Sequence, residues 1–307
     1  MDLLPIVQNI FTLFILISVG FMAFRVGFIN RAGVTGLSSL LVNITLPCLI
    51  IESMQVRITG TLIGRMEIIF LIELLVYGIS FLSAFLVPYV LGGSSYETGV
   101  FRFMLIFSNL GFMGYPVCET LFGPDSLFYV TLINIPFGLL VFTVGIFLLR
   151  PDIVRDHDMK RIFTPGLVAS LVGLLLFFTG VVIPSPVSDS LSLLGSVTTP
   201  LAMIVIGSLL ATLPVGSMFG DLRIWVISLF RLGLIPIVVL LLLRPFVSDP
   251  LLLGVPVLLA AMPVAANTVL LAEEYGVNAE LASKGVFLST ILSVATIPLI
   301  ALLIGTS

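Results

Sequence analysis

Long apolar runs separated by short polar connections make up most of the chain. A helix needs about 20 apolar residues to cross ~30 Å of hydrocarbon. An even number of crossings leaves both termini on one side of the membrane. We predict an all-α membrane protein with ten transmembrane helices, near residues 5–24, 33–54, 66–91, 99–122, 126–149, 166–183, 190–213, 222–247, 250–274 and 281–304.

Composition supports this prediction. The chain has 307 residues, of which 59% are hydrophobic and 9% charged, whereas soluble domains carry about 25% charged residues. The scattered basic residues do not form a nucleic-acid footprint, so we expect no nucleic-acid partner. The two cysteines, Cys48 and Cys118, lie in apolar runs and offer no disulfide framework or zinc site, and we expect no bound metal.

The stretch "RPDIVRDHDMKRIFTP" is the most polar in the chain and follows the fifth span. It divides the chain into a first five-helix repeat (1–150), a linker (151–164) and a second repeat (165–307). If the linker is cytoplasmic, nine basic residues lie on the cytoplasmic side and three on the other. The positive-inside bias then predicts a multi-pass protein of the cytoplasmic membrane, with both termini outside and the central loop cytoplasmic.

The two halves resemble each other. "LLVNITLP" (40–47) matches "LLGSVTTP" (193–200), and the same offset places "FGPD" (122–125) on "YGVN" (275–278). An odd number of spans per half makes the second half enter from the opposite side, so the repeats are inverted. Inverted repeats are typical of secondary transporters.

Helix breakers interrupt the fourth and ninth spans. Gly111, Gly114 and Pro116 fall in the fourth span, and Pro263 lies near the middle of the ninth. A proline removes one backbone hydrogen bond, so the freed groups must find other partners within the membrane. We expect half-helices whose N-terminal N–H groups, near 116–119 and 263–267, hold an anion.

Polar side chains lie beside both breaks. Asn109 and Asn267 either bind substrate or cap the broken backbone, because an amide both donates and accepts hydrogen bonds. Glu119 falls three residues after Pro116, and we place it in the first turn of the second half-helix. It is a candidate to carry a coupling proton, bind a cation or hydrogen-bond the broken backbone.

Two further charges lie inside spans. Glu73 is about seven residues inside the third span and Arg231 about nine inside the eighth, entering from opposite faces. At ~1.5 Å per residue across a ~30 Å core, they lie within about 7 Å in depth. We consider a Glu73–Arg231 pair that acts in gating or coupling, a static pair, or an Arg231 that meets the substrate carboxylate.

Three stretches, "SNLGFMGYP", "AAMPVAANTVLLAEEYGVNAELASKGVFLSTILS" and "TPLAMIVIGSLL", resemble the auxin efflux carrier family, which includes plant auxin exporters and bacterial malate or malonate permeases. The resemblance covers the whole chain. It implies a homodimer, a scaffold of spans 1, 2, 6 and 7, and a transport domain of spans 3–5 and 8–10. Spans 4 and 9 would cross at the substrate site, which places there Asn109, Gly111, Gly114, Pro116, Met262, Pro263 and Asn267.

The expected function is secondary transport of a small organic anion by alternating access, with H+ or Na+ as the coupling ion and no other cofactor. A sodium-coupled carrier of the bile-acid symporter type is the near alternative, and a channel or membrane sensor is the alternative of another class. We expect no enzyme, because the chain lacks HExxH and GxSxG motifs and its one histidine, His157, falls in the polar loop.

Overall fold

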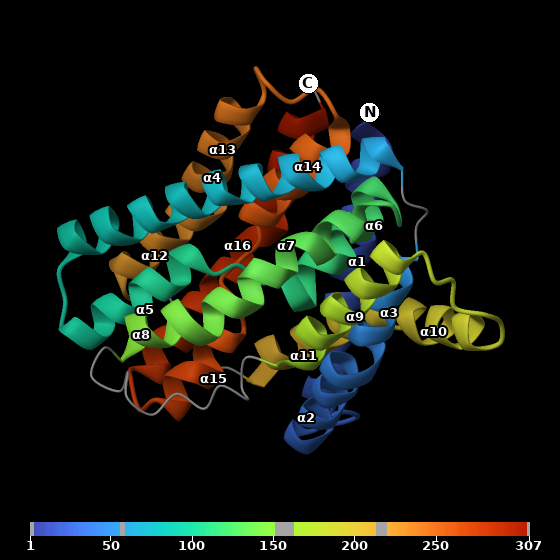
Figure 1. Ribbon diagram of the computed structural model, residues 1–307. Coiled ribbons are helices and arrows are strands. Elements are labelled where there is room, and N and C mark those ends of the chain that lie inside the picture. Colours follow the sequence, from blue (N-terminus) through green and yellow to red (C-terminus); the bar gives the residue numbers. More distant parts are fainter. Residues whose placement is uncertain (1–2, 56–58, 151–162, 213–219, 306–307) are drawn as a thin grey trace.

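The computed structural model describes residues 3–55, 59–150, 163–212 and 220–305 (Figure 1). Nearly all of the predicted linker, including His157, lies outside these residues. The first half contains Leu3–Val26 (α1), Arg31–Leu40 (α2), Leu41–Thr45 (η1), Leu46–Ser53 (α3), Gly60–Leu91 (α4), Ser95–Ile106 (α5), Leu110–Gly114 (η2), Tyr115–Phe122 (α6), Ser126–Leu140 (α7), Val141–Gly145 (η3) and Ile146–Leu149 (α8). The second half contains Pro165–Thr179 (α9), Val187–Ser196 (α10), Thr198–Thr212 (α11), Leu222–Leu229 (α12), Phe230–Leu234 (η7), Ile235–Leu243 (α13), Pro250–Ala260 (α14), Asn267–Glu274 (α15) and Ala279–Gly305 (α16).

The described helices are those of a multi-pass membrane protein. Six continuous stretches are long and apolar enough to cross a membrane, namely Arg31–Ser53, Leu62–Leu91, Ser126–Leu149, Val187–Thr212, Leu222–Leu243 and Ala279–Gly305. Phe11–Val26, Pro165–Thr179 and Pro250–Ala260 are apolar but shorter. The predicted fourth and ninth spans are not continuous helices, because each is interrupted near its middle.

Proline spacing explains the local widening of three helices. The π-helical segments η1, η2 and η7 each end two residues before a proline, at Pro47, Pro116 and Pro236. A proline cannot donate the helical hydrogen bond and its ring crowds the preceding turn, and a single wider turn relieves that crowding. These prolines therefore shift the helix register without ending the helix.

The closest helix pair is α1 against α11. A Cβ added to Gly20 would overlap the Ile204 backbone, and one added to Gly207 would overlap the Ile17 backbone. The Ser208 hydroxyl also donates to the Gly20 carbonyl at 3.1 Å. Small residues let two backbones approach and pack without a hydrophobic driving force, as membrane helices require.

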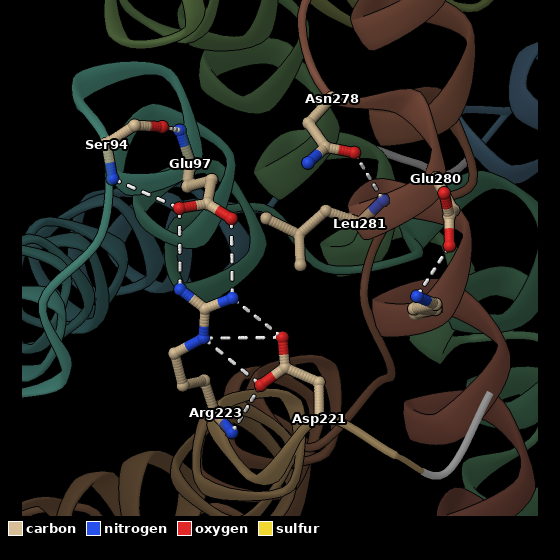
Figure 2. A network of polar contacts seen from close by, with 8 residues as sticks. Ser94, Glu97, Asp221, Arg223, Asn278, Glu280 and Leu281 are labelled. Atoms are coloured by element: carbon tan, nitrogen blue, oxygen red, sulfur yellow. Dashed lines mark hydrogen bonds and ion pairs between the residues drawn. The ribbon is translucent and has the colours of Figure 1, made fainter. Parts of the chain in front are cut away.

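A polar network joins the start of α12 to the start of α5 (Figure 2). Arg223 contacts Asp221 at 2.8 Å and Glu97 at 3.3 Å. A hydrogen bond from the Ser94 backbone N–H lowers the pKa of Glu97, and Arg223 lowers it further. A hydrogen bond from Arg223 also lowers the pKa of Asp221. Glu97 also completes a capping box with Ser94, so the same carboxylate caps α5 and binds Arg223 of α12.

A similar contact occurs between the starts of α4 and α14. Arg65 forms an ion pair with Asp249 and donates to the Tyr129 hydroxyl at 3.1 Å. Asp249 caps α14 by accepting from the Leu251 and Leu252 N–H groups. In both networks, an arginine near the start of one helix meets the capping carboxylate of a helix from the other half of the chain.

Candidate functional site

The two interrupted helices meet at their interruptions. The Asn109 N–H donates to the Pro263 carbonyl at 2.8 Å, and the Ala265 N–H donates to the Phe107 carbonyl at 3.1 Å. Ser108 and Val264 thus form an isolated antiparallel bridge, the crossing of the two chain segments. Each segment provides hydrogen-bonding partners for backbone groups of the other that have no partner within a helix. Such groups need a partner inside a membrane.

The first break lies earlier than the sequence predicted. The α5 helix ends at Ile106, and helical structure resumes at Leu110, before the three predicted breakers. Pro116 instead lies inside the resumed helix, directly after the wider turn of η2 that relieves the crowding by its ring. Glu119 accordingly lies near the end of α6, so its predicted place in the first turn of the second half-helix is wrong.

Asn109 caps the resumed helix. Its side-chain oxygen accepts a hydrogen bond of 3.2 Å from the Phe112 N–H, and the residue is buried. At the other break, the Val264 N–H donates to the Ser289 hydroxyl at 3.1 Å and the Ala265 N–H donates to the Phe107 carbonyl. Several of the N–H groups expected to bind an anion therefore already have partners, and the side-chain amides gain importance.

A cavity of about 110 Å³ lies against the crossing. Asn109, Asn267 and Asn134 line it, each from a different segment of the chain, together with Ser108 and Gly111. Large apolar side chains form much of the remaining wall: Val42, Leu46, Leu110, Phe112, Phe137 and Phe142. The lining thus combines neutral polar groups with aromatic rings.

The remaining predicted site residues support the crossing and do not line this cavity. A Cβ on Gly114 would lie 2.9 Å from the Leu259 side chain, so the glycine admits α14. Pro263 supplies the carbonyl that Asn109 binds, and Met262 supplies one to Arg231. Asn134, which the sequence reasoning missed, is an amide within the apolar run "LINIPF", and that isolation was the available signal.

Arg231 holds the ends of both broken helices. Its guanidinium donates to the carbonyls of Leu105 at 3.0 Å, Met262 at 3.2 Å and Leu259 at 3.5 Å. These carbonyls belong to the C-terminal ends of α5 and α14, which lack helical partners and carry partial negative charge. Arg231 is 1% exposed, and in the described part of the chain it makes no ion pair with Glu73 within 4.0 Å.

Comparison with known proteins identifies the chain. The family model described as "Membrane transport protein" matches residues 5–158 and 152–301, which together span almost the whole chain. The chain belongs to this family. Membership confirms the predicted resemblance and makes the protein a membrane transporter rather than an enzyme.

Three relatives carry transporter names. An "Uncharacterized transporter" of Methanothermobacter thermautotrophicus is 26% identical over 95% of this chain and 96% of its own length. A protein of Rhizobium meliloti named "Putative malonate transporter" is 27% identical over 62% of each chain. A third, an uncharacterized transporter of Methanocaldococcus jannaschii, is 23% identical over 93% of this chain and 94% of its own length.

Glu119 of this transporter lies away from the crossing cavity. Its carboxylate accepts a hydrogen bond of 2.7 Å from the Thr199 hydroxyl on α11. It lines a larger cavity of about 540 Å³ with Glu52, Arg65 and Asp125. Among the described residues, no cluster of three or more His, Cys, Asp or Glu side chains has the arrangement of a metal site.

Proposed function

We propose that this protein is a secondary transporter of a small organic anion and that the cavity at the crossing is its substrate site. The observation that carries the proposal is the meeting of Asn109, Asn134 and Asn267 around one cavity beside the two broken helices. Amide N–H groups donate to a carboxylate without adding a fixed positive charge. The phenylalanine wall suits a short carbon skeleton.

The substrate class follows from the lining and is supported by one relative. No Lys or Arg side chain lines this cavity in the described part of the chain, so its lining would hold an anion through neutral donors. A mono- or dicarboxylate of the malonate, malate or auxin type fits the cavity's neutral donors. The malonate transporter name of one relative agrees with this class.

We further propose ten spans in two inverted repeats, 1–150 and 165–307, with residues 151–164 as a cytoplasmic linker. The two arginine–carboxylate networks support this arrangement, because each joins equivalent elements of opposite halves at opposite ends of the bundle. In this proposal both termini lie outside the cytoplasmic membrane. The start of α1 and the end of α16 lie at the same edge of the molecule, which agrees with it (Figure 1).

Transport would proceed by alternating access. Helices of spans 1, 2, 6 and 7 pack together, as α1 does with α11 and α3 with α9 and α10, and would form the scaffold. Helices of spans 3–5 and 8–10 form a second group through α4, α5, α7, α13 and α14, which would form the transport domain. The family resemblance also leads us to propose a homodimer.

Uptake by proteoliposomes tests the function. Labelled malonate, malate and indole-3-acetate would be offered to the parent, to Asn109→Ala, Asn134→Ala and Asn267→Ala, and to Asn43→Ala as control. Asn43 is an exposed asparagine on span 2 whose amide bonds to Ser39. We expect the parent to show saturable uptake and counterflow of at least one acid. The three site variants should reduce that uptake at least tenfold, whereas Asn43→Ala should not.

Other outcomes separate the alternatives. Uptake that requires sodium would favour the bile-acid symporter type of mechanism. Linear flux without counterflow would indicate a channel, and binding without flux would indicate a sensor. Saturable uptake that none of the three asparagine variants changes would leave a carrier but reject the crossing cavity as its site.

A further inference from the structure

A second, smaller cavity also lies beside the crossing. It measures about 20 Å³, enough for one water molecule. Ser108, Leu110 and Phe137 line both this cavity and the substrate cavity, so these residues form the wall between them. An electrostatic change in the small cavity therefore acts on the substrate cavity across a single layer of side chains.

Polar side chains surround this small cavity. Glu73, Tyr77, Ser80 and Ser108 line it, and each is at least nine-tenths buried. Within the described part of the chain, no protein group forms a hydrogen bond with any of these four side chains. Their polar atoms are not among the fully enclosed side-chain atoms without a partner, so they are open to the cavity and to a small polar ligand in it.

Arg231 also lines the small cavity, but three of its N–H groups donate elsewhere. They reach backbone carbonyls at the ends of α5 and α14, and Arg231 forms no ion pair with Glu73 among the described contacts. The Glu73 carboxylate is therefore not held in its charged form by a direct salt bridge. The Glu73 carboxylate lies close enough to the Arg231 guanidinium for its charge to change the electrostatic potential at the crossing.

Resting on the proposed function, we propose that Glu73 binds the coupling proton and that this makes the protein a proton–anion symporter. The proton bonds to a carboxylate oxygen of Glu73. Once Glu73 is neutral, Arg231 leaves a net positive charge at the crossing, which favours an anion in the adjacent cavity. When Glu73 releases the proton on the other side, its charge cancels that of Arg231 and the anion leaves.

Proton binding and anion binding then strengthen each other, since coupling between two sites is reciprocal. The nearby Arg231 charge disfavours a sodium ion in the small cavity, whereas a proton only neutralises the carboxylate. This distinction makes the proton the coupling ion. The expected coupling is about 5- to 150-fold in anion affinity, the range usual for linked sites.

Other titratable groups on the neighbouring helices point elsewhere. On α5, Glu97 bonds to Arg223, and the Arg102 guanidinium lies over the Phe85 ring. On α7, the Tyr129 hydroxyl accepts from Arg65. The segments α13 and α14 carry no titratable side chain. Glu73, Tyr77 and Arg231 are the titratable residues that line the cavity in the described part of the chain.

The test compares the parent with Glu73→Gln and with Glu67→Gln, an exposed glutamate on the same helix. Counterflow of labelled malonate is measured without gradients, and accumulation is measured under an inward proton gradient or an inward sodium gradient. We expect parent and Glu67→Gln to accumulate malonate with the proton gradient only. Glu73→Gln, which mimics the protonated carboxyl, should retain counterflow, lose accumulation and bind malonate independently of pH.

Failure of this inference is distinguishable from failure of the proposed function. If the parent shows no counterflow of malonate, malate or indole-3-acetate, the proposed function fails. Counterflow with sodium-driven accumulation, or proton-driven accumulation by Glu73→Gln, overturns the proton site alone. If Glu73→Gln does not fold, the parent protein provides a second test. Proton uptake is measured when the parent binds malonate in weakly buffered detergent. We expect uptake, and its absence would overturn the proposal.

Discussion

The Thr199 hydroxyl donates a hydrogen bond of 2.7 Å to the Glu119 carboxylate and thereby ties α11 to α6. These helices belong to the proposed scaffold and transport domain, respectively. The contact borders the larger cavity, far along α6 from the crossing. It is therefore suited to hold the two parts together on one side of the membrane.

Loss of this bond should open the larger cavity. A hydrogen bond to a charged group contributes about 1.5–3 kcal/mol, so Thr199→Val should shift the conformational balance by roughly tenfold or more. Maleimide labelling of a cysteine at Ser192, which lines this cavity, would report the shift in a background of Cys48→Ser and Cys118→Ser. Thr212→Val is the control, since its hydroxyl bonds to its own helix. Equal labelling rates in all three proteins would contradict the role of Thr199.

Asn109 allows capping and substrate binding to be separated. Asn109→Asp keeps an acceptor for the Phe112 N–H, so the helix cap should persist and the protein should still fold. The added negative charge at the cavity should nevertheless weaken anion binding at least tenfold. Thermal unfolding and malonate affinity measured on the same sample check both statements. An aspartate variant with normal affinity would mean that Asn109 only caps the helix.

The α1–α11 contact should not tolerate a methyl group. Gly207→Ala or Gly20→Ala places a Cβ against the partner backbone, and we expect a loss of about 3 kcal/mol or more. Gly78→Ala, within α4, is the matched control because a Cβ there meets nothing within 4 Å. Thermal unfolding in detergent distinguishes them. If the three variants unfold together, α1 and α11 do not pack as closely as described.

The Arg223 network predicts a specific dependence on pH. The pKa values of Glu97 and Asp221 are lowered in the folded protein, so the network stabilises the fold fully above the ordinary carboxyl pKa of about 4. That stability is lost as pH falls through the lowered values. Arg223→Gln should thus lower the free energy of unfolding near neutrality by about 1 kcal/mol or less, given partial exposure, and the difference should disappear in acid. Arg31→Gln, an exposed arginine, serves as control; a difference that grew as pH fell would contradict the assignment.

Much of the helical organisation was predictable, because apolar length and breakers are local signals. The meeting of Asn109 with Pro263 followed from breakers in two distant spans and from the family resemblance. The position of the first break could not be predicted in this way, because an asparagine cap and a π-helical turn start the half-helix ahead of Pro116. Pattern alone could not distinguish that outcome from a break at the proline itself.

Side-chain partners were less predictable than helices. Depth in the membrane placed Glu73 and Arg231 near each other, and they do line one cavity, but the guanidinium binds backbone carbonyls. Those carbonyls become acceptors only after two helices break at the same place, which no local pattern encodes. Asn134 escaped notice for a related reason, because its relevance depends on which helix packs beside the crossing.

The bridge between Ser108 and Val264 also constrains how the protein is made. Its two segments lie about half a chain apart, so the segment around Ser108 is synthesised well before its partner. During that interval the groups around Phe107 and Asn109 need temporary hydrogen-bonding partners, such as water, lipid head groups or the insertion machinery. Synthesis of the segment around Val264 is therefore the step that completes the crossing during biogenesis, and truncated chains that stop before Pro263 should be recognised as incomplete by cellular quality control.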